Sequence, residues 1–85
     1  MNRKQRKVFD SIFQTPTLST IKFSDIEKLL ISLSFEIVEG RGSRMAFEHS
    51  ELKLFVHRPH PGKEARKYQV EAVREFWKLA GFSNE

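Results

Sequence analysis

The spacing of apolar residues changes along the chain, and this change is the strongest constraint on its fold. In residues 3–14 and again after residue 23, apolar side chains recur every three or four positions, as in helices that cover a core. From Phe35 to His57 they alternate with polar side chains, as in strands with one buried face. The helical spacing returns after residue 64. The sequence therefore predicts a small sheet between helices.

Two helices are expected before the sheet. The first covers residues 3–14, and Pro16 ends it because proline cannot continue a helix. The second starts at Ser24, since Ser24 and Glu27 have the spacing of a capping box and Phe23 can act as a hydrophobic staple. Their apolar stripes contain Val8, Phe9, Ile12 and Phe13 in the first helix and Ile26, Leu29, Leu30 and Leu33 in the second.

Three short strands follow. The first starts at Phe35, the second covers residues 44–48 and the third covers residues 52–57. Residues 40–43 form a turn, because their two glycines permit positive φ, and a tight turn is expected at residues 49–50. Such short connections predict an antiparallel meander with one apolar face.

The segment after the third strand is a stiff loop, because Pro59 and Pro61 fix the backbone and remove two donors within residues 58–64. The last helix covers residues 65–80. Its apolar face contains Val70, Val73, Phe76, Trp77 and Ala80. The predicted order is α-α-β-β-β-α. This is an α+β fold in which helices cover one face of a three-stranded antiparallel sheet.

The chain divides into a compact unit and an extension. Residues 22–82 are expected to form the unit, with a basic helix and linker in residues 1–21 and a tail in residues 83–85. The apolar stripe of the first helix needs a partner. It can pack on the unit of the same chain or join a second copy in a homodimer, and the sequence leaves both open.

The net charge of +4 is concentrated in two blocks. Residues 1–7 hold basic side chains and no acid, and residues 57–68 hold a second excess. The basic residues of the second block are Arg58, Lys63, Arg66 and Lys67. Together the blocks can form one electropositive face that attracts phosphates, which makes nucleic acid the first partner to expect. The alternative is that both are only solvated surface.

Several functional classes are disfavoured. The chain has no cysteine, which excludes disulfides and thiolate metal sites. His57 and His60 lack an obvious third ligand, so no metal is expected, and the absence of a Walker-type loop leaves no cofactor to expect. No apolar run is long enough to span a membrane, and the apolar positions of the basic first helix fit protein better than a lipid surface. The N-terminus lacks the apolar core of a secretory signal, so a cytoplasmic location is expected.

Four stretches together resemble a known family. Residues 25–36 look like its opening helix running into its first strand, and residues 40–43 occupy the place of a Gly-Ser turn. His-Pro-Gly-Lys-Glu at residues 60–64 resembles its characteristic loop, and residues 70–82 resemble its closing helix. Residues 22–82 thus resemble the HicA toxins of toxin–antitoxin systems, whose fold is similar to the double-stranded-RNA-binding domain. The helix in residues 3–14 is an addition to the minimal family pattern.

The resemblance implies a small ribonuclease that cuts messenger RNA, blocks translation and is neutralised by a HicB-type antitoxin. Family activity is attributed to the histidine of a Gly-Ser-His motif at the second strand. Here Arg44 follows Gly42 and Ser43. Arginine can bind a phosphate but stays protonated, so it cannot serve as a general base near neutral pH.

The chemistry of metal-free RNA cleavage points to other residues as well. It requires a base for the 2′-hydroxyl, an acid for the leaving 5′-oxygen and positive charge for the phosphorane. We predict His57 and His60 as catalytic residues together with Arg44, and rank His49 below them as a turn residue. Alternation should place Arg44 and His57 on one face beside Phe55.

RNA contacts are expected over a wider surface. The predicted contact residues are Arg41, Ser43, Arg44, Arg58, Lys63, Arg66 and Lys67. Shape-dependent recognition of RNA uses phosphate and 2′-hydroxyl contacts, which basic side chains at a loop and a helix start can supply. Two alternatives stay open: a non-catalytic RNA-binding module and a domain that binds only a protein partner.

Overall fold

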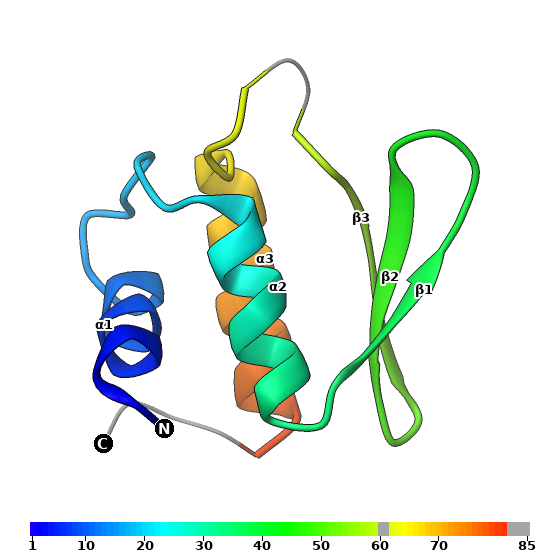
Figure 1. The fold of residues 1–85 in the computed structure, drawn as a ribbon, viewed down its shortest axis with the longest axis horizontal. Helices are drawn as coiled ribbons and strands as arrows, with labels where there is room; N and C mark the ends of the chain where they lie inside the picture. Colours follow the sequence, from blue (N-terminus) through cyan, green and yellow to red (C-terminus); the bar gives the residue numbers. More distant parts are fainter. Residues whose placement is uncertain (60–61, 82–85) are drawn as a thin grey trace.

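The elements of the chain follow the expected order. The computed structural model describes residues 1–59 and 62–81. It contains α1 (Arg3–Ile12), α2 (Phe23–Ser32), β1 (Glu36–Glu39), β2 (Arg44–His49), β3 (Leu52–His57) and α3 (Lys67–Leu79). The α+β class and the order α-α-β-β-β-α are confirmed. Figure 1 shows the three helices on one side of the molecule and the sheet on the other.

The sheet is an antiparallel meander of order β1-β2-β3. Phe47 lies opposite Ile37 on one neighbour and Leu54 on the other, and its side chain is fully buried toward the helices. Because side chains alternate along a strand, the register places Ala46 and Phe55 on the opposite, outer face. Phe55 is 77% exposed there. The outer face is therefore open within the described residues.

The N-terminal helix packs on the rest of its own chain. Phe9 meets the fully buried Trp77 edge to face, with 4.8 Å between ring centroids, and Ile12 is also fully buried. The Arg74 guanidinium donates to the backbone oxygens of Ile12 at 2.9 Å and Gln14 at 3.1 Å, which satisfies one carbonyl group at the end of α1 and one just beyond it. Of the two placements that the sequence leaves open, the structure shows the one within a single chain. A homodimer through α1 stays a prediction, and the apolar stripe that suggested it is largely covered.

The starts of two helices differ from expectation. The predicted capping box at Ser24 is wrong, because α2 begins at Phe23 and its N-cap, Lys22, makes no side-chain capping hydrogen bond. The Phe23 amide instead donates to the Lys63 oxygen at 2.9 Å. The Ala65 amide donates to the Ile21 oxygen at 2.7 Å, and the next residue, Arg66, is the extended N-cap, so α3 starts at Lys67 and not at residue 65. Long-range pairing between the two segments sets both starts.

Two further boundaries are corrected. The first helix ends at Ile12, two residues before the predicted end. His49 is not a turn residue, because β2 continues to it and pairs it with Leu52. Its ring stacks at 4.6 Å from that of Phe35. The tight turn lies one position later, with Ser50 at a φ of 54°. No helix in the described part of the chain is long and apolar enough to cross a membrane.

Candidate functional site

Polar side chains meet at the end of the sheet where β2 begins and β3 ends. Arg44 lies directly opposite His57, and both side chains are exposed on the outer face, as the alternation predicted. The Ser43 hydroxyl lies 3.4 Å from Nδ1 of His57. The structure thus brings three of the predicted site residues together: Arg44 and His57 on adjacent strands and Ser43 in the turn before β2.

The contact with Ser43 gives the His57 imidazole two useful states. When the hydroxyl donates to Nδ1, the proton of the neutral ring lies on Nε2, which then acts as a donor. When Nδ1–H donates to the hydroxyl, Nε2 is free to accept a proton. An imidazole that can hold or take a proton at one exposed atom is suited to acid–base chemistry.

The backbone beneath His57 is held by a buried side chain that the sequence analysis missed. Gln69 Nε2 donates to the His57 oxygen at 2.6 Å, and Gln69 Oε1 accepts from the Arg66 amide at 3.0 Å. Gln69 is 2% exposed and is the only buried polar residue among those described. A glutamine four residues before Val73, on the apolar face of the last helix, was the signal that could have identified it.

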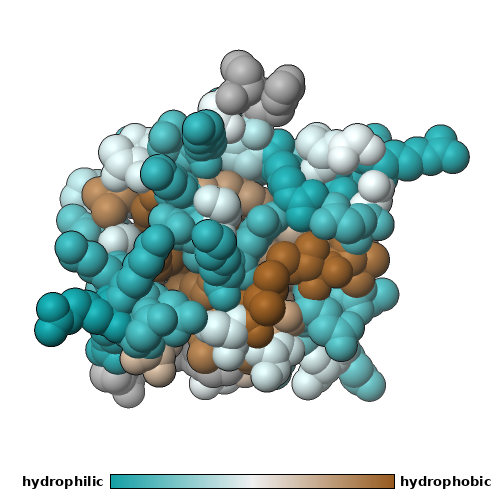
Figure 2. Space-filling model, in the orientation of Figure 1, coloured by the Kyte–Doolittle hydropathy of each residue, from teal (hydrophilic) through white to brown (hydrophobic). Residues whose placement is uncertain are grey.

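The turn before β2 presents a second arginine. Gly42 has a φ of 60°, a backbone conformation that residues other than glycine rarely adopt. Arg41 precedes it at the exposed tip of the turn. Arg41, Arg44 and Phe55 line a hollow of about 340 Å³ on this side of the sheet. Val38 contributes further exposed apolar surface. Figure 2 shows apolar atoms reaching the surface among hydrophilic side chains on the sheet half of the molecule.

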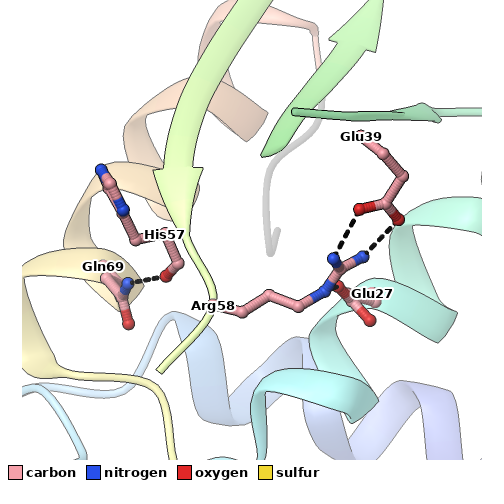
Figure 3. A network of polar contacts seen from close by, with 5 residues as sticks. All are labelled: Glu27, Glu39, His57, Arg58 and Gln69. Carbon is pink, nitrogen blue, oxygen red and sulfur yellow. Dashed lines mark hydrogen bonds and ion pairs between the residues drawn. The ribbon is translucent and has the colours of Figure 1, made fainter. Parts of the chain in front are cut away.

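Arg58 lies on the other face of the sheet. Its Nε donates to Glu27 at 2.7 Å, and its two terminal nitrogens donate to the Glu39 carboxylate at 2.6 and 2.7 Å (Figure 3). These hydrogen bonds, above all those to Glu39, raise the pKa of the Arg58 guanidinium above its ordinary value. The hydrogen bonds from Arg58 likewise lower the pKa of the Glu39 carboxyl. The sequence predicted a phosphate contact at Arg58, and the structure shows its charge matched by two carboxylates.

The other predicted contacts surround the start of α3. Lys63, Arg66 and Lys67 are exposed, and Lys63 belongs to the segment that pairs with the start of α2. Lys63 also lines a hollow of about 470 Å³ with Arg58. His60 lies outside the described residues. Within the described residues, no group of three or more metal-ligating side chains could hold a metal ion.

A comparison with models of known protein families shows the family to which the chain belongs. The family model described as "HicA toxin of bacterial toxin-antitoxin" matches residues 23–82, which run from the first residue of α2 past the end of α3. The chain belongs to the HicA toxin family. Searches of curated proteins and of solved structures gave no match.

Membership in the HicA family assigns the chain to the toxins of toxin–antitoxin systems, and the partner that such a system supplies is an antitoxin. The HicA match includes Arg44, His57 and the loop before α3. It leaves out α1, which nevertheless shares the core with α3 through Phe9 and Trp77. The site described above therefore lies within the HicA region, and α1 is an addition built onto it.

Proposed function

We propose that this HicA toxin binds RNA and cleaves messenger RNA without a metal ion, and that a HicB-type antitoxin neutralises it. The observation that carries the proposal is the cross-strand pair of Arg44 and His57, with the Ser43 hydroxyl 3.4 Å from the imidazole. The resemblance to HicA proteins leads us to expect an active histidine at position 44. The pair supplies an imidazole directly opposite, on the neighbouring strand.

In the proposed reaction, His57 Nε2 takes the proton of an RNA 2′-hydroxyl. The 2′-oxygen then attacks the adjacent phosphorus, and the bond from phosphorus to the 5′-oxygen breaks. Arg44 balances the negative charge that develops on the phosphorane, because a guanidinium binds phosphate oxygens in a fixed geometry. We assign the proton for the leaving 5′-oxygen to His60. The products are a 2′,3′-cyclic phosphate and a 5′-hydroxyl, and all atoms are accounted for without water or metal.

RNA binding in this proposal uses further exposed basic side chains in addition to the pair. Arg41 lies at the tip of the turn before β2, and Lys63, Arg66 and Lys67 lie at and before the start of α3. Flexible cations at these positions can follow phosphates without reading sequence. Arg58 keeps its two carboxylate partners and supports the site from the other face. Messenger RNA as the target places the activity in the cytoplasm.

The outer face also offers a surface for the antitoxin. Phe55 is 77% exposed and Val38 43% exposed, beside Arg44 and His57. Exposed aromatic and arginine side chains are enriched in protein interfaces and often carry much of the binding free energy. An antitoxin seated on Phe55 would cover the Arg44–His57 pair and keep RNA out.

The test is RNA cleavage by the purified chain in EDTA. We expect His57→Ala to lower the cleavage rate about 100-fold or more, which is the usual contribution of a general base. Lys53→Ala is the matched control, because Lys53 lies on the same face of the same strand, four residues from His57. The 3′ ends of the products should be cyclic phosphates.

Four outcomes would contradict the proposal. Cleavage that needs Mg²⁺, or that His57→Ala leaves unchanged, would remove the proposed mechanism. Salt-sensitive RNA binding without cleavage by the wild type would instead support a non-catalytic RNA-binding domain on the HicA scaffold. Absence of RNA binding at low salt would leave a domain that binds only a protein partner.

A further inference from the structure

A groove lined by lysines lies between α1 and the start of α2. Lys4 and Lys7 line it from α1, Lys22 from the linker and Asp25 from the first turn of α2, around a volume of about 290 Å³. All three lysines are exposed. Three ammonium groups against one carboxylate make this groove electropositive, and Figure 2 shows mainly hydrophilic side chains projecting from the α1 side of the molecule.

The charged groups of the groove lysines are not used to hold the fold. Among the residues that the structure describes, none of Lys4, Lys7 and Lys22 takes part in an ion pair. The neighbouring Arg6 differs, because its Nε lies 3.4 Å from Asp10 and its guanidinium stacks over Phe9. The groove therefore presents charge that no carboxylate of the described chain neutralises through an ion pair.

The groove connects to the proposed RNA site through Lys22. The same residue lines the hollow that contains Arg58, Pro59 and Lys63. Backbone hydrogen bonds between residues 21–23 and 63–65 keep the two segments side by side. Since Arg58 directly follows His57, this hollow brings Lys22 and Lys63 close to the end of β3, while Arg58 itself keeps its two carboxylate partners.

The position of the groove is set before any ligand binds. Phe9 packs on Trp77, and Arg74 holds the end of α1 through two backbone oxygens. A cationic surface on a packed helix loses less conformational entropy on binding than a free basic arm does. This distinguishes α1 from a tail that only raises the net charge.

We propose that the α1 groove binds the phosphate backbone of the RNA that the HicA region holds, so that α1 lengthens the RNA contact surface. This inference rests on the proposed function. Lysine is depleted in protein interfaces and is a common partner of phosphates. The groove offers three lysines and no aromatic side chain, whereas the outer face of the sheet offers Phe55 beside arginine. Its chemistry therefore favours RNA over a protein partner.

The experiment measures binding of the full chain to a fluorescent 2′-O-methyl RNA, which lacks the attacking hydroxyl and stays intact whichever residue cleaves. The double variant Lys4→Ala/Lys7→Ala is compared with Lys53→Ala/Lys78→Ala over a range of salt concentrations. Both lower the net charge by two, and Lys53 and Lys78 lie outside the groove, where each pairs with a glutamate. Circular dichroism checks that both variants fold.

We expect the groove variant to weaken binding about tenfold at low salt. It should also reduce the magnitude of the slope of log K against log salt by about 1.4, the value expected for the loss of two phosphate contacts on a single strand. The control should change affinity no more than about twofold. Equal effects of the two variants would overturn the inference and leave the proposed function standing. A groove variant that loses only affinity for a HicB-type antitoxin would assign the groove to protein and also overturn it. Failure of the wild type to bind the RNA would overturn both proposals.

Discussion

His57 and Arg58 are consecutive residues, yet they belong to regions with different roles. His57 lies on the outer face with Arg44, where both are exposed, and Arg58 lies on the inner face between Glu27 and Glu39. Figure 3 shows the two side chains leaving the strand in opposite directions. The outer face presents groups that can act on a ligand, and the inner face holds groups that already have partners within the chain.

The difference shows that local basic charge does not by itself indicate an RNA contact. Arg58 belongs to the second basic block of the sequence, in which Lys63, Arg66 and Lys67 follow it. Its charge is nevertheless matched by carboxylates from α2 and β1. Strand alternation assigns each cation to a face, and the partners on that face decide whether its charge is available.

The largest expected contrast is between two phenylalanines on opposite faces. Phe47→Ala should lower the free energy of unfolding by about 3–5 kcal/mol, because it leaves a cavity under a fully buried ring. Phe55→Ala should change it by less than about 0.5 kcal/mol, since that ring is mostly exposed. Urea denaturation of both variants measures the contrast. A similar loss for both would mean that the outer face is covered in solution.

The second contrast is between two arginines. Arg58→Ala should cost about 2 kcal/mol of stability, because it leaves the partly buried Glu27 carboxylate without its partner. Arg44→Ala should stay within about 0.5 kcal/mol. Arg58→Lys sharpens the comparison, since an ammonium cannot reproduce the paired bonds to Glu39 and should recover only part of the loss. Equal stability of the two alanine variants would contradict a structural role for Arg58.

A third prediction concerns the rate of RNA cleavage. Arg44→His should raise it about tenfold, because a protonated imidazole opposite His57 can keep a positive charge at the phosphate and also donate a proton, which a guanidinium cannot. The measurement is the initial rate with a labelled RNA near neutral pH, with Arg44→Lys as the control that keeps the charge. A rate that falls in both variants would show that the guanidinium itself is needed at the phosphate.

The smallest expected effect is a pH dependence of stability on the inner face. Arg58 holds the pKa of the Glu39 carboxyl below its ordinary value of 4.5. Just below that pH the unfolded chain takes up a proton at this carboxyl and the folded chain does not. The stabilisation is therefore present above 4.5 and is lost as the pH falls through the lower folded pKa.

Glu39→Gln tests this dependence by removing the titrating group. Its melting temperature should lie below that of the wild type at neutral pH, and the difference should shrink as the pH falls below 4.5. Glu36→Gln, on the outer face of the same strand, should show no such trend. If the difference in melting temperature between wild type and Glu39→Gln grew as the pH fell, this would contradict a lowered pKa of the Glu39 carboxyl in the folded chain.

Local patterns predicted much of this arrangement. Alternation within residues 44–57 placed Arg44 and His57 on one face, and the apolar stripe of the last helix predicted that Trp77 is buried. The same reasoning failed at Ser24, where a local capping motif competes with the hydrogen bond from Phe23 to Lys63. That bond joins residues 40 positions apart, and no local sequence pattern indicates it.

The sequence by itself determined the order of the elements and the face on which each strand residue lies, because these follow from periodicity, and the resemblance of four stretches indicated the family that the match over residues 23–82 shows. Only the tertiary structure decided that α1 packs on α3, that Gln69 holds the His57 backbone and that Arg58 pairs with Glu27 and Glu39. Each of these contacts joins segments distant in the chain. Their partners are selected by packing geometry, which exists only once the helices and the sheet have come together.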